Sequence, residues 1–201
     1  MNIWHTITFL GDSSLTVPGA CILALWLAAN RMWLDMLRWL FAFGAAMMIV
    51  VVSKLLFMGW NISPPLLNFT GVSGHSASAA ALYLAAATLF SAGRTARARM
   101  LALGVTLAAV IAVGMSRIMI KVHSGSEVTC GLLLGAAAAW WFGRALAQEG
   151  DDLRARYLPL VLASLLFLGA NGQPAPTNGL LMQLAQTLSG HDYVYTRSIP
   201  L

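Results

Sequence analysis

The chain alternates between long apolar runs and short polar segments. Reading between charged residues gives six runs: Ser14–Asn30, Trp39 to about Trp60, His75–Gly93, Met100–Ser116, Val128–Gly143 and Tyr157–Asn171. A helix needs roughly 20 apolar residues to cross about 30 Å of hydrocarbon. Most of these runs are at or below that length, so the polar residues that flank them should lie at headgroup depth. The pattern predicts an all-α, polytopic membrane bundle of about six transmembrane helices.

The two ends of the chain are amphipathic rather than continuously apolar. Residues 1–13 are expected to lie in the interface, and residues 172–201 to form an amphipathic tail with leucines at helical spacing after a proline breaker. No cleavable signal peptide is expected, because the start lacks basic residues and Asp12 interrupts the first apolar run. Gly131 and Gly135 have the spacing of closely packed helices. We expect a single integral-membrane domain over residues 1–201.

Composition supports this assignment and excludes other classes of protein. Hydrophobic residues make up 59% of the chain and charged residues only 9%, against about 25% charged in a soluble domain. So few charges could not cover a soluble surface or form a nucleic-acid-binding face, despite the net charge of +5. Cys21 and Cys130 are single residues inside apolar runs, which excludes a disulfide scaffold. The expected partner is therefore the lipid bilayer.

The basic residues predict the orientation of the bundle. Eight of the 12 lie in or beside alternate loops: Arg31, Arg38, Arg94, Arg97, Arg99, Arg144, Arg154 and Arg156. The positive-inside rule places these loops in the cytoplasm. Both chain ends and the remaining loops then face outward, toward the periplasm or exterior of a bacterial cytoplasmic membrane.

A small polar set remains on the predicted outward side. Its members are Lys54, Asn61, Ser73, His75, Ser116, Arg117, Lys121, His123 and Glu127. An arginine offers a planar fork of donors and a lysine a point charge, and both suit a dianionic phosphate. Backbone N–H groups at the helix start near Gly74 can also approach an anion. This combination predicts a phosphate site at headgroup depth.

Two histidines add chemistry to this set. His123 and Glu127 are one helical turn apart, so the carboxylate can accept the imidazole proton and fix its tautomer. A histidine held in this way can attack phosphorus, and His75 can protonate the leaving oxygen.

The spacing of these residues resembles that of the type 2 phosphatidic acid phosphatase (PAP2) superfamily. The pattern of that superfamily is a lysine followed after six residues by Arg-Pro, then Pro-Ser-Gly-His, then Ser-Arg, five residues, His, three residues and Asp. Here Lys54 is followed by Val72-Ser73-Gly74-His75, then by Ser116-Arg117, with His123 and Glu127 at the matching intervals. The third motif is the specific one, because Ser-Gly-His alone is short.

The resemblance implies a role for each matching residue. His123 would be the nucleophile that forms a phosphohistidine, oriented by Glu127, and His75 would be the acid for the leaving group and then the base for water. The phosphate oxygens would be held by Lys54, Ser73, Gly74 and Arg117. No metal and no cofactor are expected, because cationic side chains supply the charge stabilisation.

Three positions depart from the family pattern. Asn61-Ile62 stands where the family has Arg-Pro, so one phosphate-binding charge is missing. Val72 replaces the proline of the second motif, and Glu127 is one methylene longer than the family's aspartate. Asn61, Ser116 and Lys121 are further candidates for the site, with Lys121 a possible replacement for the missing charge.

Three functions fit these residues. The first is a membrane phosphatase acting on a lipid phosphate or diphosphate; undecaprenyl diphosphate is favoured over phosphatidylglycerophosphate, phosphatidic acid and lipid A phosphate, because so compact a chain has no large outward domain to grip a sugar headgroup. The second is a phosphotransferase that passes the same phosphoryl group to a lipid hydroxyl. The third is a non-catalytic protein that binds or transports lipid phosphates.

Overall fold

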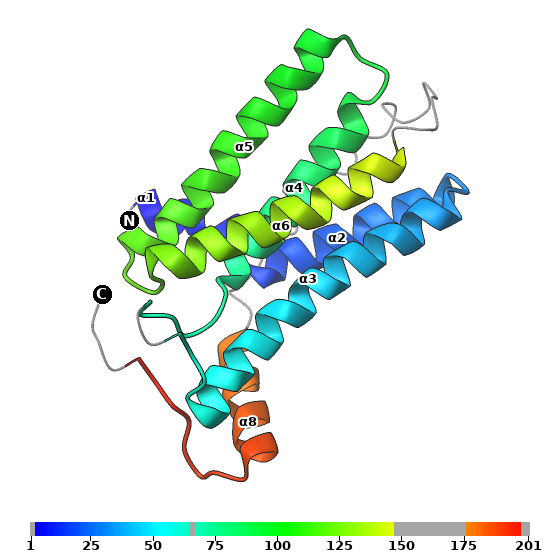
Figure 1. Ribbon diagram of the computed structural model, residues 1–201. Coiled ribbons are helices and arrows are strands. Elements are labelled where there is room, and N and C mark those ends of the chain that lie inside the picture. Colours follow the sequence, from blue (N-terminus) through cyan, green and yellow to red (C-terminus); the bar gives the residue numbers. More distant parts are fainter. Residues whose placement is uncertain (1–2, 65–66, 147–175, 198–201) are drawn as a thin grey trace.

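The computed structural model describes residues 3–64, 67–146 and 176–197, and these form helices and connecting segments without a strand among them (Figure 1). The helices are α1 (Ile3–Phe9), α2 (Ser13–Ala29), α3 (Trp33–Trp60), α4 (Gly74–Ser91), α5 (Ala96–Met119), α6 (Gly125–Leu146) and α8 (Thr177–Ser189). The predicted all-α class is confirmed for this part of the chain. The sixth predicted run, Tyr157–Asn171, lies outside the described residues.

Five predicted runs correspond to helices, and three of these helices (α3, α5 and α6) extend past the charges that were used to delimit the runs. Helix α3 begins at Trp33, so Asp35 lies in its first turn and pairs with Arg38 at 3.1 Å. An acidic residue is favourable there because it complements the helix dipole. Helix α5 continues to Met119 and carries Arg117 in its last turn. Charged residues near helix ends therefore do not mark the ends of these helices.

Among the residues that the structure describes, three stretches are long and apolar enough to cross a membrane: Ile3–Ala29, Trp33–Trp60 and Ala96–Met119. Large apolar side chains on these helices point outward, among them Leu25, Phe41 and Leu101, each about two-thirds exposed. An apolar surface of this extent is typical of a protein that contacts lipid. The helices thus indicate a membrane protein.

Helix α4 lies at the centre of the bundle and packs closely on α6. Its alanines at positions 77, 79, 80, 81 and 85 are fully buried. A Cβ built on Gly135 of α6 would lie only 2.7 Å from Cβ of Ala80, and one built on Gly131 would lie 2.6 Å from the carbonyl oxygen of Ser73. The small residues let the two backbones approach, which confirms the packing predicted from the glycine spacing.

An aromatic cluster joins α2, α3 and α6. Trp39 is fully buried, donates from Nε1 to the carbonyl oxygen of Ala20 at 2.9 Å, and packs its ring against Phe142 at a centroid distance of 5.4 Å. The indole N–H is thereby satisfied inside the core. This cluster fixes the long α3 relative to its neighbours.

The connecting segments gather at two opposite ends of the bundle (Figure 1). The α2–α3 and α4–α5 turns and the last turn of α6 lie at one end. The α3–α4 and α5–α6 segments lie at the other, together with α1 and α8. All the predicted site residues belong to these two segments or to the adjoining helix ends, so the fold collects them at one end.

Candidate functional site

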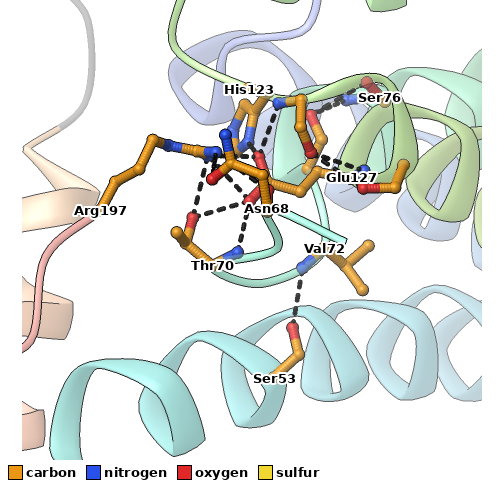
Figure 2. Close-up of polar contacts among 11 residues, drawn as sticks. Ser53, Asn68, Thr70, Val72, Ser76, His123, Glu127 and Arg197 are labelled. Carbon is orange, nitrogen blue, oxygen red and sulfur yellow. Dashed lines mark hydrogen bonds and ion pairs between the residues drawn. The ribbon is translucent and has the colours of Figure 1, made fainter. Parts of the chain in front are cut away.

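The α3–α4 segment delivers the second motif to the start of α4. Ser73 is the N-cap, and its Oγ lies 2.9 Å from Oγ of Ser76. Gly71 has φ +128°, and a Cβ there would lie 3.0 Å from Cα of Lys54, so only glycine allows the segment to pass this close to α3. The backbone N–H of Val72 donates to Oγ of Ser53 at 3.0 Å (Figure 2). These contacts hold the first and second motifs together.

The α5–α6 segment presents His123 beside Glu127. Nδ1 of His123 lies 2.7 Å from Oε2 of Glu127, whose side chain is fully buried. The same oxygen accepts the backbone N–H of Ser124 at 2.9 Å, while Oγ of Ser124 accepts the N–H of Glu127 at 3.4 Å. This reciprocal pair is a capping box at the start of α6. The carboxylate is thus fixed by the helix start and faces the imidazole.

The protonation of this pair follows from its surroundings. Burial alone would raise the pKa of Glu127, but hydrogen bonds from His123, Thr70 and Ser124 outweigh it and lower that pKa to about 2. Burial lowers the pKa of the His123 imidazole below its ordinary 6.5, and the hydrogen bond to Glu127 opposes this only in part. At neutral pH the imidazole is therefore neutral. Its proton lies on Nδ1, because the carboxylate can only accept, and Nε2 keeps a free lone pair.

A second carboxylate lies beside the other histidine. Oδ2 of Asp12 is 3.4 Å from Nε2 of His75, and Oδ1 of Asp12 accepts the N–H of Ser14 as the N-cap of α2. The α1–α2 turn can approach His75 because it contains Gly11, which has no side chain. A Cβ at this position would lie 2.9 Å from the carbonyl oxygen of His75. Sequence reasoning missed Asp12 as a site residue. An aspartate just before an apolar run is an N-cap signal, but it gives no hint of the partner.

Two cations complete the set. Arg117 donates from Nη1 to Oγ1 of Thr8 at 2.8 Å, and its Nε is buried without a hydrogen-bond partner among the described residues. Lys54 is half-buried on α3, and the part of the chain that the structure describes gives its ammonium no hydrogen bond or ion pair. Electrostatic interactions connect Lys54 and Arg117 with both His75 and His123. Donors are therefore available for an anion between the histidines.

The three further candidates have local roles at helix ends. Asn61 is exposed and ends α3 in the left-handed conformation with φ 56°, which asparagine tolerates well. Lys121 is exposed with φ 58°, just past α5. Ser116 is fully buried and donates from Oγ to the carbonyl oxygen of Val113 at 2.6 Å.

A second residue at the site was also missed by sequence reasoning. Arg197, in the tail after α8, donates from Nη2 to both carboxylate oxygens of Glu127, at 2.9 and 2.8 Å (Figure 2). Its Nη1 donates to Asn68, at 2.9 Å to the carbonyl oxygen and 2.7 Å to Oδ1. No local motif marks this arginine, and 70 residues separate it from Glu127.

The comparison with known families agrees with this geometry. Residues 36–150, which include all three motifs, match the PAP2 superfamily. The chain belongs to the PAP2 superfamily. Members of this superfamily are generally phosphatases. A relative from Klebsiella pneumoniae, described as an uncharacterized 22.5 kDa protein in the cps region, is 38% identical over 208 residues that cover 97% of this chain and 96% of that protein. No solved structure matches the chain.

The departures from the PAP2 pattern have local explanations in the structure. Proline at position 72 would delete the N–H that bonds Ser53. Glutamate at position 127 completes the capping box with Ser124, a motif that favours Glu or Gln over Asp. At position 61, where the PAP2 pattern has arginine, Asn61 has a positive φ at the end of α3, a conformation that asparagine adopts readily. Each of the three replacements therefore fits the local backbone conformation or a hydrogen bond to the backbone at its position.

Proposed function

We propose that this PAP2 protein is a membrane lipid phosphatase that hydrolyses a lipid phosphate or diphosphate through a phosphohistidine at His123. One observation carries the proposal: a neutral imidazole, held at Nδ1 by the buried Glu127, lies in the electrostatic range of Lys54 and Arg117. A nucleophile and two cations in one partly buried site are what phosphoryl transfer to an enzyme side chain requires.

The first half-reaction transfers the phosphoryl group to the protein. Nε2 of His123 attacks phosphorus with its lone pair, and the bond from phosphorus to the lipid oxygen breaks. The charge of Asp12 and the bound phosphate dianion favour the protonated form of His75. His75 gives its proton to that oxygen, so the lipid leaves as an alcohol, or as a lipid monophosphate when the substrate is a diphosphate. Glu127 keeps its hydrogen bond to Nδ1–H and stabilises the positive charge that develops on the ring.

The second half-reaction returns the enzyme to its starting state. His75, now neutral, accepts a proton from water, and the oxygen of that water attacks phosphorus. The bond from phosphorus to Nε2 breaks, its electrons return to His123, and inorganic phosphate leaves. Lys54, Arg117 and the backbone around Ser73 and Gly74 hold the phosphate oxygens in both steps. These donors supply the charge stabilisation, so the proposed mechanism uses no metal and no cofactor.

The proposed site lies at the outer face of a bacterial cytoplasmic membrane. Arg31 and Arg94, in the α2–α3 and α4–α5 turns, belong to the end of the bundle opposite the histidines, in keeping with six spans and an outward-facing site under the positive-inside rule. A lipid headgroup reaches this depth from the bilayer. Undecaprenyl diphosphate is the favoured substrate, because the described segments at this end are short and offer little surface for a sugar headgroup.

The test is phosphate release by purified protein in detergent from a panel of lipids: undecaprenyl diphosphate, phosphatidylglycerophosphate, phosphatidic acid and lipid A. We expect release that survives chelator and is lost in His75→Ala and His123→Ala, while Arg97→Gln, at an exposed position on α5, retains it. Mass spectrometry of the lipids identifies a phosphotransferase by a newly phosphorylated lipid. Absence of phosphate release from every lipid contradicts the proposal.

A further inference from the structure

The C-terminal tail returns to the candidate site along the end of α3. Helix α8 packs on α3 where a Cβ on Gly59 would lie 3.4 Å from Cβ of Ser189. Beyond α8, Nδ1 of His191 lies 3.1 Å from the carbonyl oxygen of Gly59. The backbone N–H of Tyr195 donates to the carbonyl oxygen of Met58 at 2.9 Å. The last carbonyls of a helix lack intrahelical partners, so the tail satisfies groups that α3 leaves open.

This attachment sets the place of Arg197. Two residues beyond Tyr195, the guanidinium enters the site with a side chain only 17% exposed. It reaches Glu127, both oxygens of Asn68 and, at 3.3 Å, Oγ1 of Thr70 (Figure 2). Asn68 and Thr70 belong to the segment that leads into the Ser73-Gly74-His75 motif. One side chain thus joins the tail, the α3–α4 segment and the start of α6.

The charge of Glu127 explains why a cation is needed here. The carboxylate is fully buried and ionised, and its imidazole partner is neutral at neutral pH. A buried charge without an ionic partner is costly. A net negative charge on the His123–Glu127 pair would also repel a phosphate from the nucleophile. Arg197 neutralises that charge, which leaves Lys54 and Arg117 free to bind the anion.

We propose that Arg197 is a positioning residue of the active site, supplied by the C-terminal tail, which holds and neutralises Glu127 and thereby orients His123. The inference rests on the proposed function. It assigns Arg197 no contact with substrate: its bonds are to Glu127 and to the α3–α4 segment, and it acts through Glu127 on the imidazole.

The kinetic test compares Arg197→Gln with Arg197→Lys, and uses Thr196→Ala as the matched control at the exposed neighbouring position. We expect Arg197→Gln to lower kcat by about ten- to a hundredfold with little change in KM. Arg197→Lys should recover part of the loss, because it restores the charge without the fork, and Thr196→Ala should match wild type. Tyr195→Pro, which deletes the N–H bonded to Met58, should reproduce the Arg197→Gln defect. A rise in KM with unchanged kcat in Arg197→Gln overturns the inference in favour of a direct phosphate contact.

A second readout does not depend on turnover. The charged and titratable groups around His123 are Glu127, Lys54, Arg117, His75 and Arg197. Removing the arginine leaves Glu127 unopposed, so the pKa of His123 should rise by about one pH unit. Histidine NMR titration of ¹⁵N-labelled wild type and Arg197→Gln in detergent measures this shift.

The possible outcomes separate the two proposals. An unshifted titration together with wild-type kcat in Arg197→Gln overturns the role of the tail and leaves the phosphatase proposal intact. Loss of activity without a titration shift also overturns it, because it indicates a purely structural residue. A shifted titration in a protein that hydrolyses no lipid phosphate supports the contact and contradicts the proposed function alone.

Discussion

Nδ1 of His123 lies 2.7 Å from Oε2 of Glu127, and the carboxylate is fully buried. The pair is built by the start of α6, since Glu127 also closes the capping box with Ser124. It therefore couples the stability of a helix end to the orientation of the proposed nucleophile.

Replacing this carboxylate should abolish most of the activity. In Glu127→Gln the amide no longer fixes Nδ1 as the protonated nitrogen or stabilises a cationic ring, so we expect kcat to fall by on the order of 10²–10⁴. Glu127→Asp, which carries the residue of the family pattern, keeps the charge and should lose far less. Steady-state phosphate release measures both, with circular dichroism as the check on folding. Equal losses in the two variants would show that the charge is not what matters.

The pH dependence should report the neutral imidazole. The nucleophile must be deprotonated, and burial lowers the pKa of His123 below 6.5. On the acid side, the neutral nucleophile is therefore retained at neutral pH, and activity falls as the pH drops through this lowered value. The acid limb of kcat/KM in wild type should have an apparent pKa below 6.5. An acid limb above 7 would contradict the assignment.

Asp12 should matter for substrates with poor leaving groups. Its Oδ2 lies 3.4 Å from Nε2 of His75, and loss of its charge in Asp12→Asn should weaken the proposed acid. We expect about a ten- to hundredfold loss on a lipid phosphate. The loss should be much smaller on p-nitrophenyl phosphate, whose leaving group needs no proton. His75→Ala should show the same contrast more strongly, and an equal loss on both substrates would count against acid catalysis.

The helix contact at Gly135 should be essential for stability. A leucine there meets Ala80 of α4, whereas Gly104 on α5 has nothing within 4 Å of its Cβ direction. Gly135→Leu should cost about 1–3 kcal/mol or more of stability and lower the thermal unfolding temperature in detergent. Gly104→Leu is the matched control and should unfold close to wild type. Similar unfolding temperatures in the two variants would disprove the tight packing.

Local periodicity predicted much of this fold and part of the site. The apolar runs predicted helices α2 to α6, the Gly131–Gly135 spacing predicted close packing of α6 on a helix that the sequence did not identify, and four-residue spacing paired His123 with Glu127. These features depend on neighbours along one helix or on one strong pattern. Helix ends were less predictable, because charges in a first or last turn do not stop a helix.

The residues that were missed are joined to the site only by tertiary packing. Asp12 reaches His75 through the α1–α2 turn, and Arg197 reaches Glu127 across 70 residues after α8 docks on α3. Neither has a local pattern that names its partner. The partner of a single charged residue near either end of an apolar chain cannot be predicted from local sequence, because it is set by how the helices pack at that end of the bundle.

The most direct test of the central claim is to trap the covalent intermediate. Wild type and His75→Ala are mixed with a lipid phosphate labelled with ³²P, quenched in alkali, where phosphohistidine is stable, and digested for mass spectrometry. With the lipid phosphate, the mechanism predicts label on His123 in wild type and none in His123→Ala. With ³²P-labelled p-nitrophenyl phosphate, whose leaving group needs no proton, it predicts more label in His75→Ala than in wild type, because water attack is slowed. Phosphate release by His123→Ala at the wild-type rate, or label on another residue, would contradict the account.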